Sequence, residues 1–192
     1  MDDVATPRMK DVLAKLKGGD RRSIGRSDEV ATEVSKSPAL LSDLWAGLFN
    51  DDPVVRMRAA DAIEKATREH PERLQPWKQA IFEAAFVCEN KEVRWHLAQL
   101  LPRLSLTPGE RETAVRILMG YLADASSIVK TFSMQALADL AARDERLLAQ
   151  VMPVIERLTQ TGTPAMRSRG RKLLKQLGNS RRPASNKRAT AK

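Results

Sequence analysis

Aromatic residues, cysteine and long apolar runs are all scarce in this chain of 192 residues. Three Trp, four Phe and one Tyr are its only aromatics, so a core must be built mainly from Leu, Ala, Val and Ile. The single cysteine, Cys88, excludes an internal disulfide and favours a reducing compartment. No apolar stretch approaches the roughly 18–20 residues that span a bilayer, and the acidic N-terminus lacks a signal peptide's apolar segment. These absences predict a cytoplasmic protein without membrane association.

The alternating apolar pattern of strands is also absent, and a helical pattern that occurs four times takes its place. Apolar or small residues recur at i, i+4, i+7, i+8 and i+11. The copies start at Val55, Val93, Val129 and Met166, which are 38, 36 and 37 residues apart. A second stripe, spaced i, i+3, i+4, i+7, precedes each copy and starts at Leu41, Trp77, Val115 and Val151. Helical spacing repeated at a longer fixed period is typical of a helical repeat array.

Each repeat is therefore predicted to be a pair of helices, a first helix and a second helix. Proline at the first helical turn behind an acid or a hydroxyl predicts that second helices begin at Pro53 and Pro164. We expect an all-α fold, a right-handed α–α superhelix of about four helix pairs. Residues 1–38 are predicted to form an N-terminal helical cap with a degenerate first repeat, 39–179 the helix pairs, and 180–192 a disordered basic tail.

The net charge of +9 lies at one end of the chain. Residues 1–156 carry 22 Lys/Arg and 24 Asp/Glu, whereas residues 157–192 carry 11 Lys/Arg and no acid. Such a concentration of cations produces a field that suits polyanions. Residues 180–192 have no large apolar side chain, which is why disorder is expected there. A segment that only improves solubility is the alternative interpretation.

The residue after each pattern start is basic, at Arg56, Arg94, Lys130 and Arg167. Together with the motifs DDPVVRMRAADAI, NKEVRWHLAQLL, DASSIVKTFSMQAL and TPAMRSRGRKLL, this resembles the HEAT-repeat family over about residues 20–179. The chain is similar to small bacterial HEAT-repeat proteins of undefined function. The resemblance implies an α-solenoid with an acid–arginine ladder between neighbouring repeats, and for this ladder Asp124 and Lys130 have the family spacing.

The candidate binding surface is the concave face that second helices form in such solenoids. Its predicted residues are Arg56, Arg58, Arg94, Trp95, Lys130, Arg167, Arg169 and Arg171. The basic residues could contact phosphates, or they could cap helices and bridge repeats. Trp95 lies off the apolar stripe, so it could anchor a partner or cover the junction between repeats.

No catalytic, cofactor or metal site is predicted. His70, His96 and Cys88 lack the spacing of a zinc site, and Asp51 and Asp52 sit at a helix start, where acids offset the helix dipole. The predicted function is a non-catalytic scaffold or adaptor whose second-helix surface binds a protein. The alternative is a nucleic-acid-binding module that uses the basic row and the basic C-terminus, and a less favoured one is an enzyme resembling DNA-repair glycosylases or lyases of this fold. The oligomeric state stays open.

Overall fold

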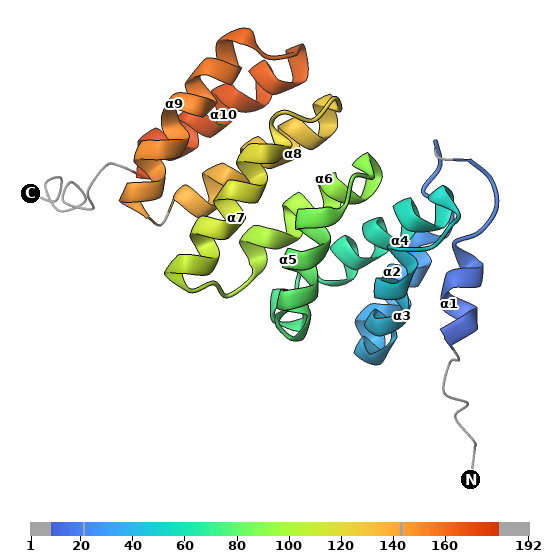
Figure 1. Ribbon diagram of the computed structural model, residues 1–192. Coiled ribbons are helices and arrows are strands. Elements are labelled where there is room, and N and C mark those ends of the chain that lie inside the picture. The colour runs from blue at the N-terminus through green and yellow to red at the C-terminus, as the bar shows by residue number, and fades with distance from the viewer. Residues whose placement is uncertain (1–8, 21, 143, 181–192) are drawn as a thin grey trace, which may run out of the picture. The chain divides into compact units, whose positions relative to one another are not determined.

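The computed structural model describes residues 9–20, 22–142 and 144–180 (Figure 1). These residues form ten α-helices and three short 3₁₀ helices and contain no strand, which confirms the predicted all-α fold. The chain divides into two compact units, Met1–Ser105 (unit 1) and Leu106–Lys192 (unit 2). No helix within the described ranges is both long and apolar enough to span a membrane.

Unit 1 consists of a helical cap followed by two helix pairs. Its α-helices are α1 (Met9–Lys15), α2 (Ser27–Lys36), α3 (Leu41–Gly47), α4 (Pro53–Ala66), α5 (Lys78–Val87) and α6 (Lys91–Leu100), and its 3₁₀ helices are η1 (Pro38–Leu40), η2 (Pro71–Trp77) and η3 (Leu101–Arg103). The second helices pack in chain order, α2 on α4 and α4 on α6 (Figure 1). They therefore form one continuous layer within this unit.

Unit 2 consists of two helix pairs. Its helices are α7 (Pro108–Tyr121), α8 (Ser127–Ala141), α9 (Glu145–Thr161) and α10 (Pro164–Ser180). Helix α10 packs against both α8 and α9. The approach to α9 depends on Gly170, because a Cβ atom there would lie 2.0 Å from the hydroxyl of Thr159. Of the predicted tail, only Ser180 is described, at the end of α10.

Local capping explains where the second helices begin. The side chains of Asp52, Asn90 and Ser126 accept hydrogen bonds from the first backbone N–H groups of α4, α6 and α8. These N–H groups have no partner inside their own helix, so the side-chain oxygen satisfies them. The predicted starts at Pro53 and Pro164 are confirmed.

The repeated apolar pattern is the core of both units. The four starting residues are buried, as are nearly all the positions that follow them, and Leu174 is a half-buried exception. Leu97, Leu100, Leu101 and Leu137 are almost fully buried, as the pattern predicts. Among the scarce aromatics, Trp45 and Trp77 pack together with ring centroids 5.5 Å apart.

Two prolines interrupt helices that the apolar pattern predicts to be continuous. Helix α6 ends at Leu100, and the pattern continues through a 3₁₀ turn that contains Pro102. Trp77 lies at the end of η2, directly after Pro76, rather than inside α5. Proline has no backbone N–H and clashes with the preceding turn, so the apolar side chains stay inward while the helix tightens.

Candidate binding surface

Arg56 and Arg94 close the turns that lead into α4 and α6. The Arg56 guanidinium donates to the carbonyl oxygens of Asn50 and Asp51, at 2.6 and 3.0 Å. Arg94 donates from Nε to the carbonyl of Cys88, at 2.5 Å. In both cases the arginine bonds the second helix to the turn that follows the first helix of the same pair. Two members of the predicted basic row therefore have the capping role that was the alternative to contacting phosphates.

Arg58 does not lie on the surface, which corrects its predicted place in the binding row. Its side chain is buried, with the residue 3% exposed, and its guanidinium faces the loop between α1 and α2. There it donates to five carbonyl oxygens, those of Leu16, Lys17, Gly18, Asp20 and Ser23, at 2.7–3.4 Å. A buried guanidinium needs such acceptors because desolvation is costly without them. Arg58 thus organises the N-terminal cap.

The same loop passes so close to Arg58 that one position requires glycine. Gly25 has a φ of +55°, a left-handed conformation that residues with a Cβ rarely adopt. A Cβ atom there would lie 2.6 Å from the central carbon of the Arg58 guanidinium. The loop and the arginine therefore fit each other through backbone atoms alone.

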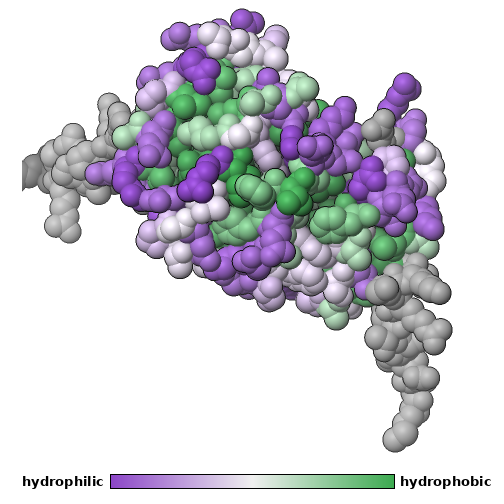
Figure 2. Space-filling view, in the orientation of Figure 1, coloured by the Kyte–Doolittle hydropathy of each residue, from purple (hydrophilic) through white to green (hydrophobic). Residues whose placement is uncertain are grey.

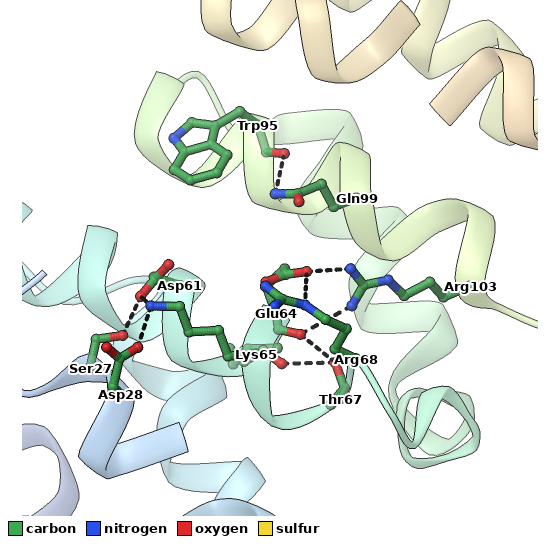
Figure 3. Close-up of polar contacts among 11 residues, drawn as sticks. Ser27, Asp28, Asp61, Glu64, Lys65, Thr67, Arg68, Trp95, Gln99 and Arg103 are labelled. Atoms are coloured by element: carbon green, nitrogen blue, oxygen red, sulfur yellow. Dashed lines mark hydrogen bonds and ion pairs between the residues drawn. The ribbon is translucent and has the colours of Figure 1, made fainter. Parts of the chain in front are cut away.

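Lys65 on α4 joins two carboxylates that come from neighbouring second helices (Figure 3). Its ammonium lies 2.5 Å from Asp28 on α2 and 2.6 Å from Asp61 on α4, and Asp61 also accepts from Ser27. Burial lowers the pKa of Lys65, but the bonds to Asp28 and Asp61 outweigh this effect and raise it. The single ammonium offsets one of the two negative charges and holds both carboxylates in position.

Glu64, which directly precedes Lys65 on α4, is a buried carboxylate held by two arginines (Figure 3). Arg68 donates to it at 2.6 Å, and Arg103 of η3 donates both to its carboxylate and, at 3.0 Å, to its backbone carbonyl. Burial raises the pKa of Glu64, whereas the hydrogen bonds from the two arginines lower it, and the net shift is downward. This cluster joins the end of α4 to the turn that follows α6.

Trp95 and His96 lie next to these clusters on α6. Trp95 is half-buried, and its ring packs on the His96 imidazole, with centroids 3.4 Å apart. The Trp95 carbonyl accepts from the Gln99 amide (Figure 3). His96 is 1% exposed, and neither ring nitrogen has a hydrogen-bond partner within the described residues. Burial lowers the pKa of His96 to about 4, although Asp61 and Glu64 oppose this shift.

The predicted cations of unit 2 are less tightly held than those of unit 1. Arg169 donates to the Gln135 amide oxygen on α8, at 2.7 Å. Lys130 is half-buried, Arg167 and Arg171 are exposed, and these three make no ion pair with any residue the structure describes. Helix α10 has no acidic residue. Its outward side is therefore a region of uncompensated positive charge.

Metal-binding side chains do not gather within the described ranges. No group of three or more His, Cys, Asp or Glu side chains in this part of the chain could hold a metal ion. Cys88 is half-buried, and burial raises the pKa of its thiol, which opposes the thiolate form that a nucleophile needs. The layer of α2, α4 and α6 therefore offers a surface with fixed charges and the partly buried Trp95.

A comparison with protein families matches the sequence to the HEAT repeat domain over residues 15–177. The chain belongs to the HEAT-repeat family. No curated protein matches this HEAT-repeat chain. Among solved structures, it is similar to an engineered protein, a structural genomics consortium target, with 15% identity, a TM-score of 0.60 and coverage of 90% of this chain and 80% of that chain. It is also similar to computationally designed armadillo repeat proteins for modular peptide recognition, with 13% identity, a TM-score of 0.54 and coverage of 90% and 88%.

Several residues that organise this surface were not singled out in the sequence. Glu64 and Arg68 are four residues apart on one helix, which is a recognisable ion-pair signal. Arg103 was not predictable as their partner, because it lies 39 residues from Glu64 in the sequence. The burial of His96 was not predicted, although it follows from the position of this residue beside the apolar stripe of α6.

Proposed function

We propose that this HEAT-repeat protein is a non-catalytic cytoplasmic scaffold that binds a protein partner on the layer formed by α2, α4 and α6. The observation that carries the proposal is Trp95, a large aromatic residue that is only partly buried on α6 beside clusters of fixed charge. Tryptophan contributes strongly to protein interfaces because a large apolar ring is buried at little entropic cost. That designed armadillo repeat proteins were made for peptide recognition supports the choice of partner.

The surroundings of Trp95 support binding because they are already ordered. Lys65 and Glu64 each make two or more polar contacts, and one partner of each, Asp28 or Arg103, belongs to a neighbouring element. Side chains held in this way lose little freedom when a partner arrives, which favours affinity and specificity. The same contacts leave few free charges, so recognition would depend on shape and on Trp95 more than on net charge.

Photo-crosslinking at Trp95 tests this proposal. The photoreactive residue benzoylphenylalanine replaces Trp95 in one variant and the exposed Ser42 of α3 in a matched control. We expect a protein cross-link from a cell lysate only at position 95, unaffected by nuclease and suppressed by unlabelled wild-type protein. About ten times more Trp95→Ala protein than wild-type protein should be required to suppress the cross-link. Equal cross-linking at both positions, or loss after nuclease treatment, would contradict the proposal.

Nucleic acid is a second candidate partner, favoured by the outward side of α10. Arg167, Arg171 and Lys175 follow one another at intervals of four residues, are exposed, and have no ion-pair partner within the described ranges. Lys172 is also exposed. No large apolar side chain is exposed among them, so the contact would be with phosphates and independent of base sequence. In unit 1 this role is weakened, because Arg56, Arg58 and Arg94 bind carbonyls.

A salt titration of fluorescent single-stranded oligonucleotide binding tests the second candidate. About five phosphate contacts would weaken binding on the order of a hundredfold when salt rises fourfold. Arg167→Gln with Arg171→Gln and Lys175→Gln should lower the slope by about 2. Neutralising three exposed cations elsewhere, Lys17, Lys36 and Arg116, is the control with the same change in net charge. Equal slopes for the two triple variants would exclude α10, and removal of residues 180–192 measures the share of the predicted tail.

A further inference from the structure

Two turns of unit 1 expose large apolar side chains. Phe49, after α3, is 61% exposed, and Phe86 and Val87, at the end of α5, are 78% and 65% exposed. These turns connect the first and second helices of each pair, and we call the surface that they form the edge of unit 1. Figure 2 shows that hydrophobic residues, in green, reach the surface among hydrophilic ones, in purple. Exposed apolar groups that gather at one place mark interaction sites in soluble proteins.

The two turns present the same arrangement of side chains. Phe49 and Val87 stand six residues before the pattern starts Val55 and Val93, and an exposed acid follows each two residues later, Asp51 or Glu89. Neither acid makes an ion pair with any described residue. In unit 2 the equivalent positions hold Ala123 with Ala125, and Gln160 with Gly162. The apolar–acid pair is thus a property of unit 1.

The turns that carry these pairs are held in place by the arginines described above. Arg56 binds the carbonyls of Asn50 and Asp51, and Arg94 binds the carbonyl of Cys88. The same turns end in the side-chain caps of α4 and α6. Because the backbone is fixed on both sides, the exposed side chains form a preorganised surface.

The spacing of the two pairs follows from helix packing. Helices α4 and α6 pack against each other, and packed helices lie about 8–10 Å apart. Since each pair precedes one of these helices by the same number of residues, we expect the pairs to lie roughly 10 Å apart. Two turns of an α-helix span about 11 Å, so a helix could place one apolar side chain at each pair.

We infer that this edge of unit 1, defined by Phe49, Asp51, Phe86, Val87 and Glu89, binds a basic amphipathic helix. Apolar side chains of the ligand contact Phe49, Phe86 and Val87, and its flanking Lys or Arg side chains pair with Asp51 and Glu89. Recognition of this kind combines apolar anchors with charge complementarity, the second of which sets specificity. The inference is independent of the proposed Trp95 surface.

The charges of the edge argue against other occupants. The carboxylates of Asp51 and Glu89 are the exposed charges of the two apolar–acid pairs, whereas Arg56 and Arg94 are turned to backbone carbonyls. Exposed carboxylates repel nucleic acid and the anionic surface of membranes. A second copy of the same edge would place like charges together. The basic helix α10 of a second copy has the right charge, but it exposes no large apolar side chain among the residues described. A partner with both features is therefore the one that fits.

Fluorescence anisotropy of a labelled peptide tests the inference. The probe is an amphipathic helix of Leu and Lys, and its matched counterpart carries Glu in place of Lys. The wild-type chain should bind the Lys peptide and not the Glu peptide. The double variant Phe49→Ser with Val87→Ser should weaken binding about tenfold or more. The control double variant is Ile24→Ser with Ile128→Ser, which alters two exposed apolar residues at other sites, 45% and 55% exposed, and it should bind as the wild type does.

A second pair of variants separates charge from folding. Asp51→Asn with Glu89→Gln should keep the helical circular dichroism spectrum, lower the affinity severalfold and reduce its dependence on salt. Trp95→Ala should leave peptide binding unchanged, so failure of the scaffold proposal would not affect this result. The inference is overturned if the Glu peptide binds equally well or if the Ile24/Ile128 variant loses as much affinity. It is also overturned if sedimentation shows a dimer of the wild-type chain that the Phe49/Val87 variant does not form.

Discussion

Unit 1 and unit 2 use the cation at the same repeat position in different ways. In unit 1, Arg56 and Arg94 bind carbonyls of the preceding turn. In unit 2, Lys130 and Arg167 make no ion pair with a described residue, and Arg167 is exposed. A guanidinium offers five donors in a planar fork, whereas the lysine ammonium is a point charge, which accounts for Lys130. Arg167 has the same guanidinium as Arg56 and Arg94 and is nevertheless exposed. The position in the repeat therefore does not by itself determine what the cation contacts.

The contrast extends to other charged residues of the second helices, whereas the first helices of unit 2 are joined by ion pairs such as Arg111 with Asp144. Unit 1 pairs its buried charges across helices, as in the Lys65 and Glu64 clusters. Unit 2 leaves the cations of α10 facing outward. Internal pairing produces a rigid layer, whereas unpaired cations produce an electrostatic field. Unit 1 therefore offers paired charges and unit 2 exposed cations on their second helices, and the following experiments test this contrast.

The largest expected effect comes from truncating the core of either unit. Leu101→Ala in unit 1 and Leu137→Ala in unit 2 should each lower the free energy of unfolding by about 2–5 kcal/mol, because both leucines are fully buried. Urea denaturation measures the loss, and hydrogen exchange shows whether amides of the other unit are affected. A loss below roughly 0.5 kcal/mol would mean that the repeated stripe is not the core.

Replacing the buried arginine of the cap should be nearly as costly. Arg58→Met leaves buried carbonyls without their donor and should cost on the order of 3 kcal/mol. Arg169→Met in unit 2 is the matched control, and it should cost less than about 1 kcal/mol, because Arg169 makes one side-chain contact to Gln135. If both variants lose the same stability by thermal or urea unfolding, the distinction between internal and outward arginines is wrong.

Acid should destabilise unit 1 through His96. Its pKa is about 4 in the folded chain and about 6.5 when unfolded, so the unfolded state binds the proton first. Stability should fall as pH decreases from about 6.5 towards 4, by up to roughly 3 kcal/mol. The effect should be measured above about pH 4.5, before carboxylates such as Glu64 titrate.

The His96→Leu variant should remove most of this pH dependence, whereas His70→Gln, which alters an exposed histidine, should retain it. An imidazole that titrates near pH 6.5 in the NMR spectrum of the folded His70→Gln protein would contradict the prediction.

The smallest effect compares the shared repeat position directly. Arg56→Met should cost about 1 kcal/mol, since its two bonds to the turn are lost. Lys130→Met should cost less than about 0.5 kcal/mol, as is usual for a residue without a specific contact. Differential scanning calorimetry of the two variants measures both values, and equal losses would remove the contrast between the units.

Features that depend on neighbouring residues could be predicted from the sequence. The buried stripes and the helix starts at Pro53 and Pro164 follow from spacing and capping within one helix. The apolar spacing continues across Pro76 and Pro102, so this pattern does not predict the 3₁₀ segments that contain them.

The roles of individual arginines were not predictable, because they depend on contacts between distant parts of the chain. Arg58 and Arg56 are both basic residues near the start of α4, and only the fold shows that one is buried and the other closes a turn. The roles of Trp95 and the α10 cations remain predictions, since no partner is defined by the geometry of this chain alone.

Arg58 also has a consequence for the order in which the protein can form during its synthesis. The loop between α1 and α2 leaves the ribosome before α4 does, and Arg58, the donor that satisfies the loop carbonyls, is added some 35–42 residues later. At about 5–20 residues per second, synthesis of that interval takes several seconds. The N-terminal cap therefore cannot close on its own, and it completes only after α4 has emerged, which makes α4 the template on which the beginning of the chain folds.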